Sequence, residues 1–233
     1  MPTAKPTPRK RPRPSPSTSR TVNRSQPARG TLKRYAEKRD FTQTPEPAGK
    51  KAPTGKALRF VVQKHHASHL HYDFRLEADG VLKSWAVPKG PTLNPADRRL
   101  AMQVEDHPLD YRDFEGIIPK GNYGAGEVIV WDRGTYHLAE GSNPAAEIGR
   151  GKIKFILKGK KLNGLFTLVR MRPRDGSENA WLLVKDDDYG ADARWQADQH
   201  EESVKSGRTL ADVAANKRAA KWISNRNADG TRR

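Results

Sequence analysis

The feature that most constrains the fold is a succession of short runs rich in β-branched and aromatic residues. Gly, Pro, Asn and Asp residues separate the runs, a pattern typical of strands joined by tight turns. Such spacing predicts a mainly β protein with an antiparallel, barrel-like core and only a few short helices. The expected strands span residues 58–64, 70–76, 81–87, 99–105, 127–132, 135–138, 153–157, 165–171 and 180–185.

Turn and helix signals add detail to this outline. The sequence Ala78-Asp79-Gly80 predicts a tight hairpin between the second and third expected strands. Residues 32–38 and 143–149 indicate short helical turns, and the apolar spacing of residues 209–222 predicts a C-terminal helix that closes over one end of the barrel.

Positive charge is concentrated before the first expected strand. Residues 1–56 hold 15 basic and three acidic residues, a net charge of +12 out of +17 for the whole chain. Residues 1–31 are mostly Pro, Ser, Thr and Arg. We expect a disordered tail, because these residues have too little apolar surface to bury to offset the entropic cost of ordering the chain. A basic arm favours nucleic acid as the partner, although a purely solubilising tail has the same composition.

These observations predict an organisation with one folded domain. We expect a disordered basic tail at 1–31, a short helix and linker at 32–57, a β-barrel domain with its C-terminal helix at 58–226, and a basic tail at 227–233. The chain has no cysteine, which excludes thiolate metal sites and cysteine nucleophiles. It shows no apolar run of membrane-spanning length, so we expect a cytoplasmic, nucleoid-associated protein without a membrane partner.

The stretch of residues 65–75 combines a strand pattern with reactive side chains. Because side chains alternate across a strand, His71, Asp73 and Arg75 share one face, and Leu70, Tyr72, Phe74 and Leu76 share the other. With His65 close behind, imidazole and carboxylate groups can ligate a divalent metal, and the guanidinium suits a phosphate. A solvated, salt-bridged strand face explains the same residues equally well.

Other polar residues follow the neighbouring strands. Lys89 leaves the third expected strand, Arg99 opens the fourth, and His107 and Tyr111 follow its end. We expect these side chains to meet at one barrel mouth, although each alone also fits a turn, surface or rim position. The glycines of residues 119–126 lack the spacing of a phosphate-binding loop and predict a tight connection between strands.

Five segments together resemble a known family. They are QKHHA at 63–67, LHYDFRLE at 70–77, LKSWAVPKGP at 82–91, VEDHPLDY at 104–111 and GAGEVIVWD at 124–132. The sequence is similar to the 3′-phosphoesterase domain of bacterial DNA ligase D, from about residue 38 to about residue 226. The resemblance implies a barrel-like β fold and a hydrolase that uses Mn²⁺, with other divalent transition metals as alternatives.

The resemblance also implies an activity and a set of site residues. The family trims 3′-terminal ribonucleosides and 3′-phosphates from DNA or RNA ends during end-joining repair. By position, the metal ligands are His65, His71 and Asp73, the phosphate-binding catalytic residues are Arg75, Lys89, Arg99 and His107, and Tyr111 is a further catalytic residue. His107 would stabilise the transition state or protonate the leaving oxygen, and the nucleophile would be a 2′-hydroxyl or water; the sequence leaves both pairs open.

Partners and alternatives follow from what the chain contains. The implied partner is the 3′ end of a primer-template. Because no polymerase or ligase motif occurs, we expect a stand-alone form that works with a separate DNA ligase and Ku-type end-joining proteins. Two other readings remain: a non-catalytic DNA-end binding module, and an iron oxygenase that uses His71, Asp73 and His107 as a 2-His-1-carboxylate triad.

Overall fold

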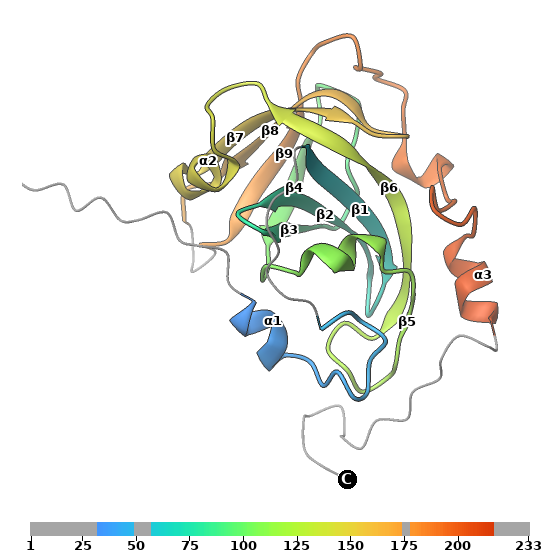
Figure 1. Ribbon diagram of the computed structural model, residues 1–233. Coiled ribbons are helices and arrows are strands. Elements are labelled where there is room, and N and C mark those ends of the chain that lie inside the picture. Colours follow the sequence, from blue (N-terminus) through green and yellow to red (C-terminus); the bar gives the residue numbers. More distant parts are fainter. Residues whose placement is uncertain (1–31, 49–56, 174–177, 217–233) are drawn as a thin grey trace, which may run out of the picture.

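The computed structural model describes residues 32–48, 57–173 and 178–216 (Figure 1). The tails expected at 1–31 and 227–233, most of the linker, and the end of the C-terminal helix with Trp222 lie outside the described residues.

The described chain forms a closed antiparallel barrel (Figure 1). Eight strands follow one another in the order β1-β2-β3-β4-β9-β8-β7-β6, and pairing of β6 with β1 closes the ring. The short β5 lies outside the ring and pairs with the start of β6. The strands are β1 (Leu58–His66), β2 (Leu70–Ala78), β3 (Val81–Val87), β4 (Arg98–Gln103), β5 (Gly116–Ile118), β6 (Gly126–Leu138), β7 (Lys152–Lys158), β8 (Asn163–Arg170) and β9 (Ala180–Lys185). The predicted mainly β, barrel-like fold is confirmed.

Two strands differ from the sequence prediction. The separate strands expected at 127–132 and 135–138 are one continuous strand, β6, which crosses from β1 and β5 to β7. Gly134, between the two expected strands, marks a close approach: a Cβ there would lie 2.0 Å from the carbonyl oxygen of Lys158. The three-residue β5 was missed because it is too short to show a periodicity.

The turn between β2 and β3 is the predicted tight hairpin. Ala78 pairs with Val81, and both turn residues have positive φ, 53° at Asp79 and 77° at Gly80. Asp and Gly tolerate this left-handed conformation better than other residues, which is why the pair specifies the turn. The hairpin fixes the register of the strand that carries His71 and Asp73.

The helices are short and lie outside the barrel (Figure 1). They are α1 (Lys33–Glu37), α2 (Pro144–Arg150), α3 (Leu210–Ala215) and the 3-10 helices η1 (Leu109–Asp113) and η2 (Ala197–Gln199). Asn143 caps α2, and Thr209 and Asp212 form a capping box at the start of α3. The described helix α3 packs mainly beside β6. Among the described helices, none has the length and apolarity needed to cross a bilayer.

Apolar side chains pack on both sides of the wall formed by β1, β2, β3 and β6. The barrel interior holds one cluster, which includes Phe74, Trp85, Trp131, Phe155 and Trp181. A second cluster lies between the outer face of this wall and the segments that cover it, and it includes Tyr35, Val61, Leu82, Tyr111 and Val130. Polar residues on the outer face of this wall are therefore buried as well.

Candidate metal and phosphate site

A cavity of about 270 Å³ lies on the outer face of the barrel wall. Its lining includes His65, His71, Asp73, Arg75, His107 and Tyr111, together with Arg39, Glu105, Tyr123 and Gly124. The outward direction follows from strand alternation, since Tyr72 and Phe74 between these residues belong to the interior cluster. The site therefore lies on the wall and not at the expected barrel mouth.

The two histidines and the aspartate come from one hairpin. His65 of β1 pairs directly with His71 of β2, and Asp73 lies two residues further along the same face. One ligand atom from each lies within 4.8 Å of the others. Nδ1 of His65 is 3.5 Å from Oδ2 of Asp73, and Nε2 of His71 is 3.8 Å from Oδ1. These are nitrogen and oxygen donors that converge on one point.

Backbone carbonyls orient both imidazoles. Nε2 of His65 lies 2.8 Å from the Gly124 carbonyl oxygen, and Nδ1 of His71 lies 3.0 Å from the His69 carbonyl oxygen. A carbonyl can only accept, so these nitrogens donate and carry the hydrogens. The lone pairs of Nδ1 of His65 and Nε2 of His71 then face Asp73. Histidine ligands of metals are commonly held by such a second hydrogen bond.

Asp73 and Arg75 form a buried charged pair beside this triad. Nη2 of Arg75 lies 3.1 Å from Oδ2 of Asp73. Burial alone would raise the pKa of Asp73, but the adjacent Arg75 guanidinium outweighs it and holds that pKa well below the usual range. Asp73 is therefore ionised, as a metal ligand must be.

The Arg75 guanidinium is fixed on three sides. Nε donates to Oε1 of Gln63 at 2.9 Å, Nη1 donates to Oγ of Ser84 at 2.8 Å, and the group lies 4.9 Å from the Tyr111 ring centroid. Only 2% of the residue is exposed, so its charge acts in a poorly solvated site. A cation held this way suits an anionic ligand beside the triad.

His107 is buried between the barrel and the N-terminal segment. Its Nδ1 donates to the Glu105 carbonyl oxygen at 2.9 Å, and its Nε2 lies 3.2 Å from Nη2 of Arg39 and accepts from it. Burial, together with Arg75 and Arg39, lowers the pKa of His107 well below 6.5. The imidazole is neutral, with one nitrogen donating and the other accepting.

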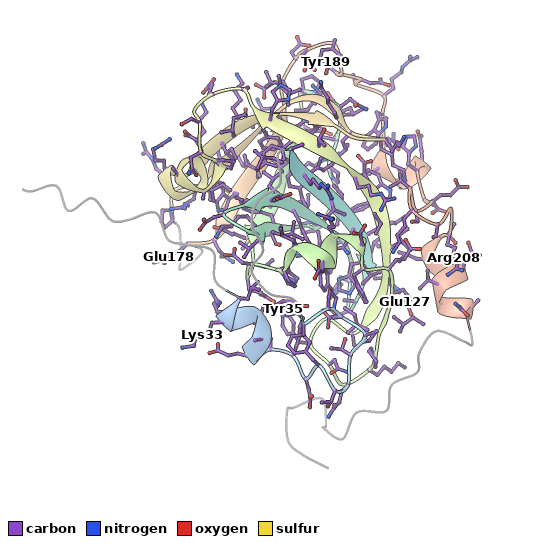
Figure 2. The ribbon with its side chains drawn as sticks, in the orientation of Figure 1. Lys33, Tyr35, Glu127, Glu178, Tyr189 and Arg208 are labelled. Atoms are coloured by element: carbon purple, nitrogen blue, oxygen red, sulfur yellow. The ribbon has the colours of Figure 1, made fainter. Side chains whose placement is uncertain are left out.

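The segment of residues 33–47 completes the cavity, which sequence reasoning did not foresee. Nε of Arg39 donates to Oε1 of Glu46 at 2.8 Å, and Nη1 donates to Oε1 of Glu105 at 3.3 Å. The Tyr111 hydroxyl donates to the same Oε1 of Glu46 at 2.9 Å. The one sequence signal for Arg39 and Glu46 was that the family resemblance begins near residue 38. Figure 2 labels Tyr35, whose ring lies 4.9 Å from that of His107.

Lys89 and Arg99 do not line the cavity. Lys89 is exposed, two residues beyond Val87, which pairs with Tyr72. Nη2 of Arg99 donates to Oδ2 of Asp97 at 2.8 Å, and Nε of Arg99 is buried without a hydrogen-bond partner in the described chain. The cavity therefore gathers six of the eight expected site residues, and Lys89 and Arg99 lie outside its lining.

Fold and site together define a class: a closed antiparallel barrel with a His-His-Asp triad and a buried arginine on its outer wall. Residues 63–170 match the family model of the DNA ligase D 3′-phosphoesterase domain. This matched region belongs to that family of phosphoesterase domains.

Curated relatives agree with the family match. The chain is 54% identical over 190 residues to the multifunctional non-homologous end joining protein LigD of Pseudomonas aeruginosa, covering 79% of this chain and 22% of that protein. It is 47% identical over 145 residues to the LigD of Mycobacterium tuberculosis, covering 62% and 19%, and 44% identical over 156 residues to that of Mycolicibacterium smegmatis, covering 64% and 20%. The chain thus spans about a fifth of the length of these relatives.

Proposed function

We propose that this protein is a divalent-metal-dependent phosphoesterase that removes 3′-terminal ribonucleosides and 3′-phosphates from DNA or RNA ends during end-joining repair. The observation that carries the proposal is the juxtaposition of the oriented His65-His71-Asp73 triad with the buried Arg75 guanidinium. Metal ligands and a fixed cation on one cavity wall are what phosphoryl transfer requires, because charge on the phosphate oxygens must be neutralised in place.

The residues present fit a metal ion. Two imidazole lone pairs and an ionised carboxylate converge in the described structure, and this donor set suits Mn²⁺, Zn²⁺ or Fe²⁺ alike. When bound, such an ion supplies Lewis-acid stabilisation to a phosphate oxygen. We favour Mn²⁺ because of the family resemblance; the donor set does not choose between these metals.

Arg75 and His107 have different tasks in this proposal. Arg75 contributes positive charge that is already oriented by Gln63 and Ser84, so it loses little freedom on binding a phosphate. His107 is a neutral acceptor for Arg39, which favours a stabilising role over protonation of the leaving oxygen. Tyr111 stacks against the Arg75 guanidinium and ties Glu46 to the site, so it positions these charges.

Lys89 and Arg99 would bind the phosphate from the side. The buried Nε of Arg99 is a donor without an acceptor, a state that costs free energy unless a ligand supplies the acceptor. Primer-template 3′ ends are the proposed substrates, and a separate DNA ligase and Ku-type proteins are proposed partners.

The decisive experiment incubates the protein with Mn²⁺ and a labelled primer-template that ends in one ribonucleotide, and a second one that ends in a 3′-phosphate. We expect loss of the ribonucleoside and of the phosphate, neither of which occurs after chelation of the metal. Binding without turnover would identify an end-binding module. Oxygen consumption with Fe²⁺ and 2-oxoglutarate, in place of end trimming, would support an oxygenase.

A further inference from the structure

A second, basic groove lies on the same side of the barrel as the cavity. It has a volume of about 320 Å³ and is lined by the cations Arg59, Arg112, Arg133 and Lys160, by the acidic Asp113, and by Phe60, Gly134 and Thr135. None of these residues belongs to the lining of the metal cavity. The groove is therefore a separate feature that the proposed chemistry does not use.

Strand pairing shows that the groove shares the outer face with the triad. Phe60 points into the barrel and Val61 points outward, so Arg59 points outward like His65 on the same strand. Arg59 pairs with Thr135, and Val61 pairs with Arg133, so these partners project to the same outer side. η1 lies across this wall and separates the groove from the cavity.

The groove carries a surplus of positive charge. Its lining has four cations and one carboxylate. Arg112 and Arg133 share that carboxylate, at 3.2 and 3.0 Å. In the part of the chain that the structure describes, no ion pair engages the side chain of Arg59 or Lys160. A polyanion fits this concave surface better than any neutral partner.

Buried groups hold the groove in shape. The Asp132 carboxylate accepts from the backbone N–H groups of Lys160, Lys161 and Leu162 at 2.9, 3.1 and 2.8 Å, which fixes the turn that presents Lys160. On the opposite bank, Nε2 of Gln63 donates to the carbonyl oxygens of Tyr111 and Phe114, which anchors η1 and hence Arg112. The cations therefore stand on fixed turns, and binding costs little backbone ordering.

The distance to the triad matches a length of duplex. Arg59 and His65 are six residues apart on β1, about 20 Å at the rise of a strand. A nucleic-acid duplex advances about 3.4 Å per base pair, so this distance corresponds to about six base pairs.

We propose that the groove binds the phosphate backbone of a nucleic-acid duplex about six base pairs upstream of the 3′ end that lies in the cavity. This inference rests on the proposed function only in taking a 3′ end as the ligand of the cavity. The groove recognises phosphate charge, so affinity should depend on the length of the duplex and not on its base sequence.

The test uses a double variant, Arg59→Gln with Lys160→Gln, because both residues are exposed and neither side chain has an ion-pair partner to lose. The matched control, Lys152→Gln with Arg172→Gln, removes the same charge from exposed positions at the other end of β7 and beyond β8. Affinity is measured by fluorescence anisotropy for hairpins that share one 3′ end and one uncharged linker, with stems of about 4 or about 14 base pairs.

On the long stem, the groove variant should bind about tenfold more weakly at low salt, and its slope of log K against log salt should be shallower by roughly 1.8 units, because two phosphate contacts are lost. On the short stem it should bind like the intact protein, and the control variant should match the intact protein on both. Methylphosphonates placed about six nucleotides from the 3′ end should weaken binding of the long stem by the intact protein, and they should leave binding by the groove variant unchanged.

Equal binding of the long stem by the groove variant and the intact protein would overturn the proposal, and so would an equal loss on both stems. The trimming assay keeps this result separate from the proposed function. An intact protein that trims no 3′ end refutes that function, while the stem-length dependence of binding still decides the role of the groove.

Discussion

At the scale of single residues, the site depends on hydrogen bonds that orient atoms before any ligand arrives. The Gly124 and His69 carbonyls orient the two imidazole rings, and hydrogen bonds to Gln63 and Ser84 orient the Arg75 guanidinium group. Each of these partners is itself part of the barrel wall or of a loop that leads into one of its strands. Small changes in the wall should therefore reach the chemistry without touching a ligand.

The triad assignment makes a direct prediction for His71. His71→Ala should lower Mn²⁺ affinity and abolish 3′ trimming together, because one of three ligands is lost. His66→Ala is the matched control, since His66 is the exposed neighbour of His65 and contacts Glu127 outside the triad. Calorimetric metal titration beside trimming rates checks both variants. Full activity in the His71 variant would refute the metal assignment.

Arg75 should matter for folding as well as for turnover. Arg75→Ala leaves the buried Asp73 carboxylate without its cation and removes the partners of Gln63 and Ser84, so we expect a loss of about 3–5 kcal/mol of unfolding free energy. The exposed Arg98→Ala should stay within about 0.5 kcal/mol. Urea unfolding measures both. A fully stable Arg75→Ala protein would mean that water replaces these contacts at no cost.

At the scale of elements, the segment of residues 33–47 is held on the barrel by ion pairs as well as by the apolar packing of Tyr35. The Glu105 carboxylate accepts from Lys38 at 2.9 Å and from Arg39 at 3.3 Å; the pair with Arg39 is shielded from water, whereas Lys38 is partly exposed. Arg39 in turn reaches His107. Docking of this segment and the arrangement of the cavity are therefore one event.

This docking should weaken in acid. Burial raises the pKa of Glu105, but Lys38 and Arg39 outweigh it, so the folded-state pKa lies below its ordinary value. Ionised Glu105 therefore stabilises the fold above that ordinary pKa, and the contribution is lost as pH falls through the lowered one. Unfolding free energy of the Glu105→Gln variant should start lower and decline less between neutral pH and about pH 3 than that of the intact protein. Parallel pH profiles would contradict the assignment.

The sequence predicted the elements better than their surroundings. Strand alternation correctly placed His71, Asp73 and Arg75 on one face, and Asp79-Gly80 correctly specified the hairpin. The pattern could not tell which face was the barrel interior, because apolar clusters cover both sides of this wall. Arg39 carried no periodic signal, since it reaches the site through a segment that has almost no regular structure.

At the scale of the whole molecule, two truncations distinguish the contribution of the basic residues 1–31 from that of the segment of residues 33–47. Removing residues 1–31 deletes eight basic residues and no residue of the cavity, so trimming at saturating substrate should persist, while the salt dependence of binding should become shallower. Removing residues 1–47 also deletes Tyr35, Arg39 and Glu46, so trimming should fall sharply. Single-turnover rates at several salt concentrations compare the two, and equal rates would show that the 33–47 segment is dispensable.

The pairing of His65 with His71 also bears on the order of folding. All three residues of the triad lie on the hairpin of the consecutive strands β1 and β2. Closure of the barrel, in contrast, pairs β1 with β6, which is distant in the sequence. Local hairpins form in about 1–10 μs, but distant pairings are slower because a large loop must be closed first. The nascent chain can therefore assemble its three proposed metal ligands well before the ring is complete, and a hairpin that bound metal at that stage would serve as a nucleus around which later strands are added.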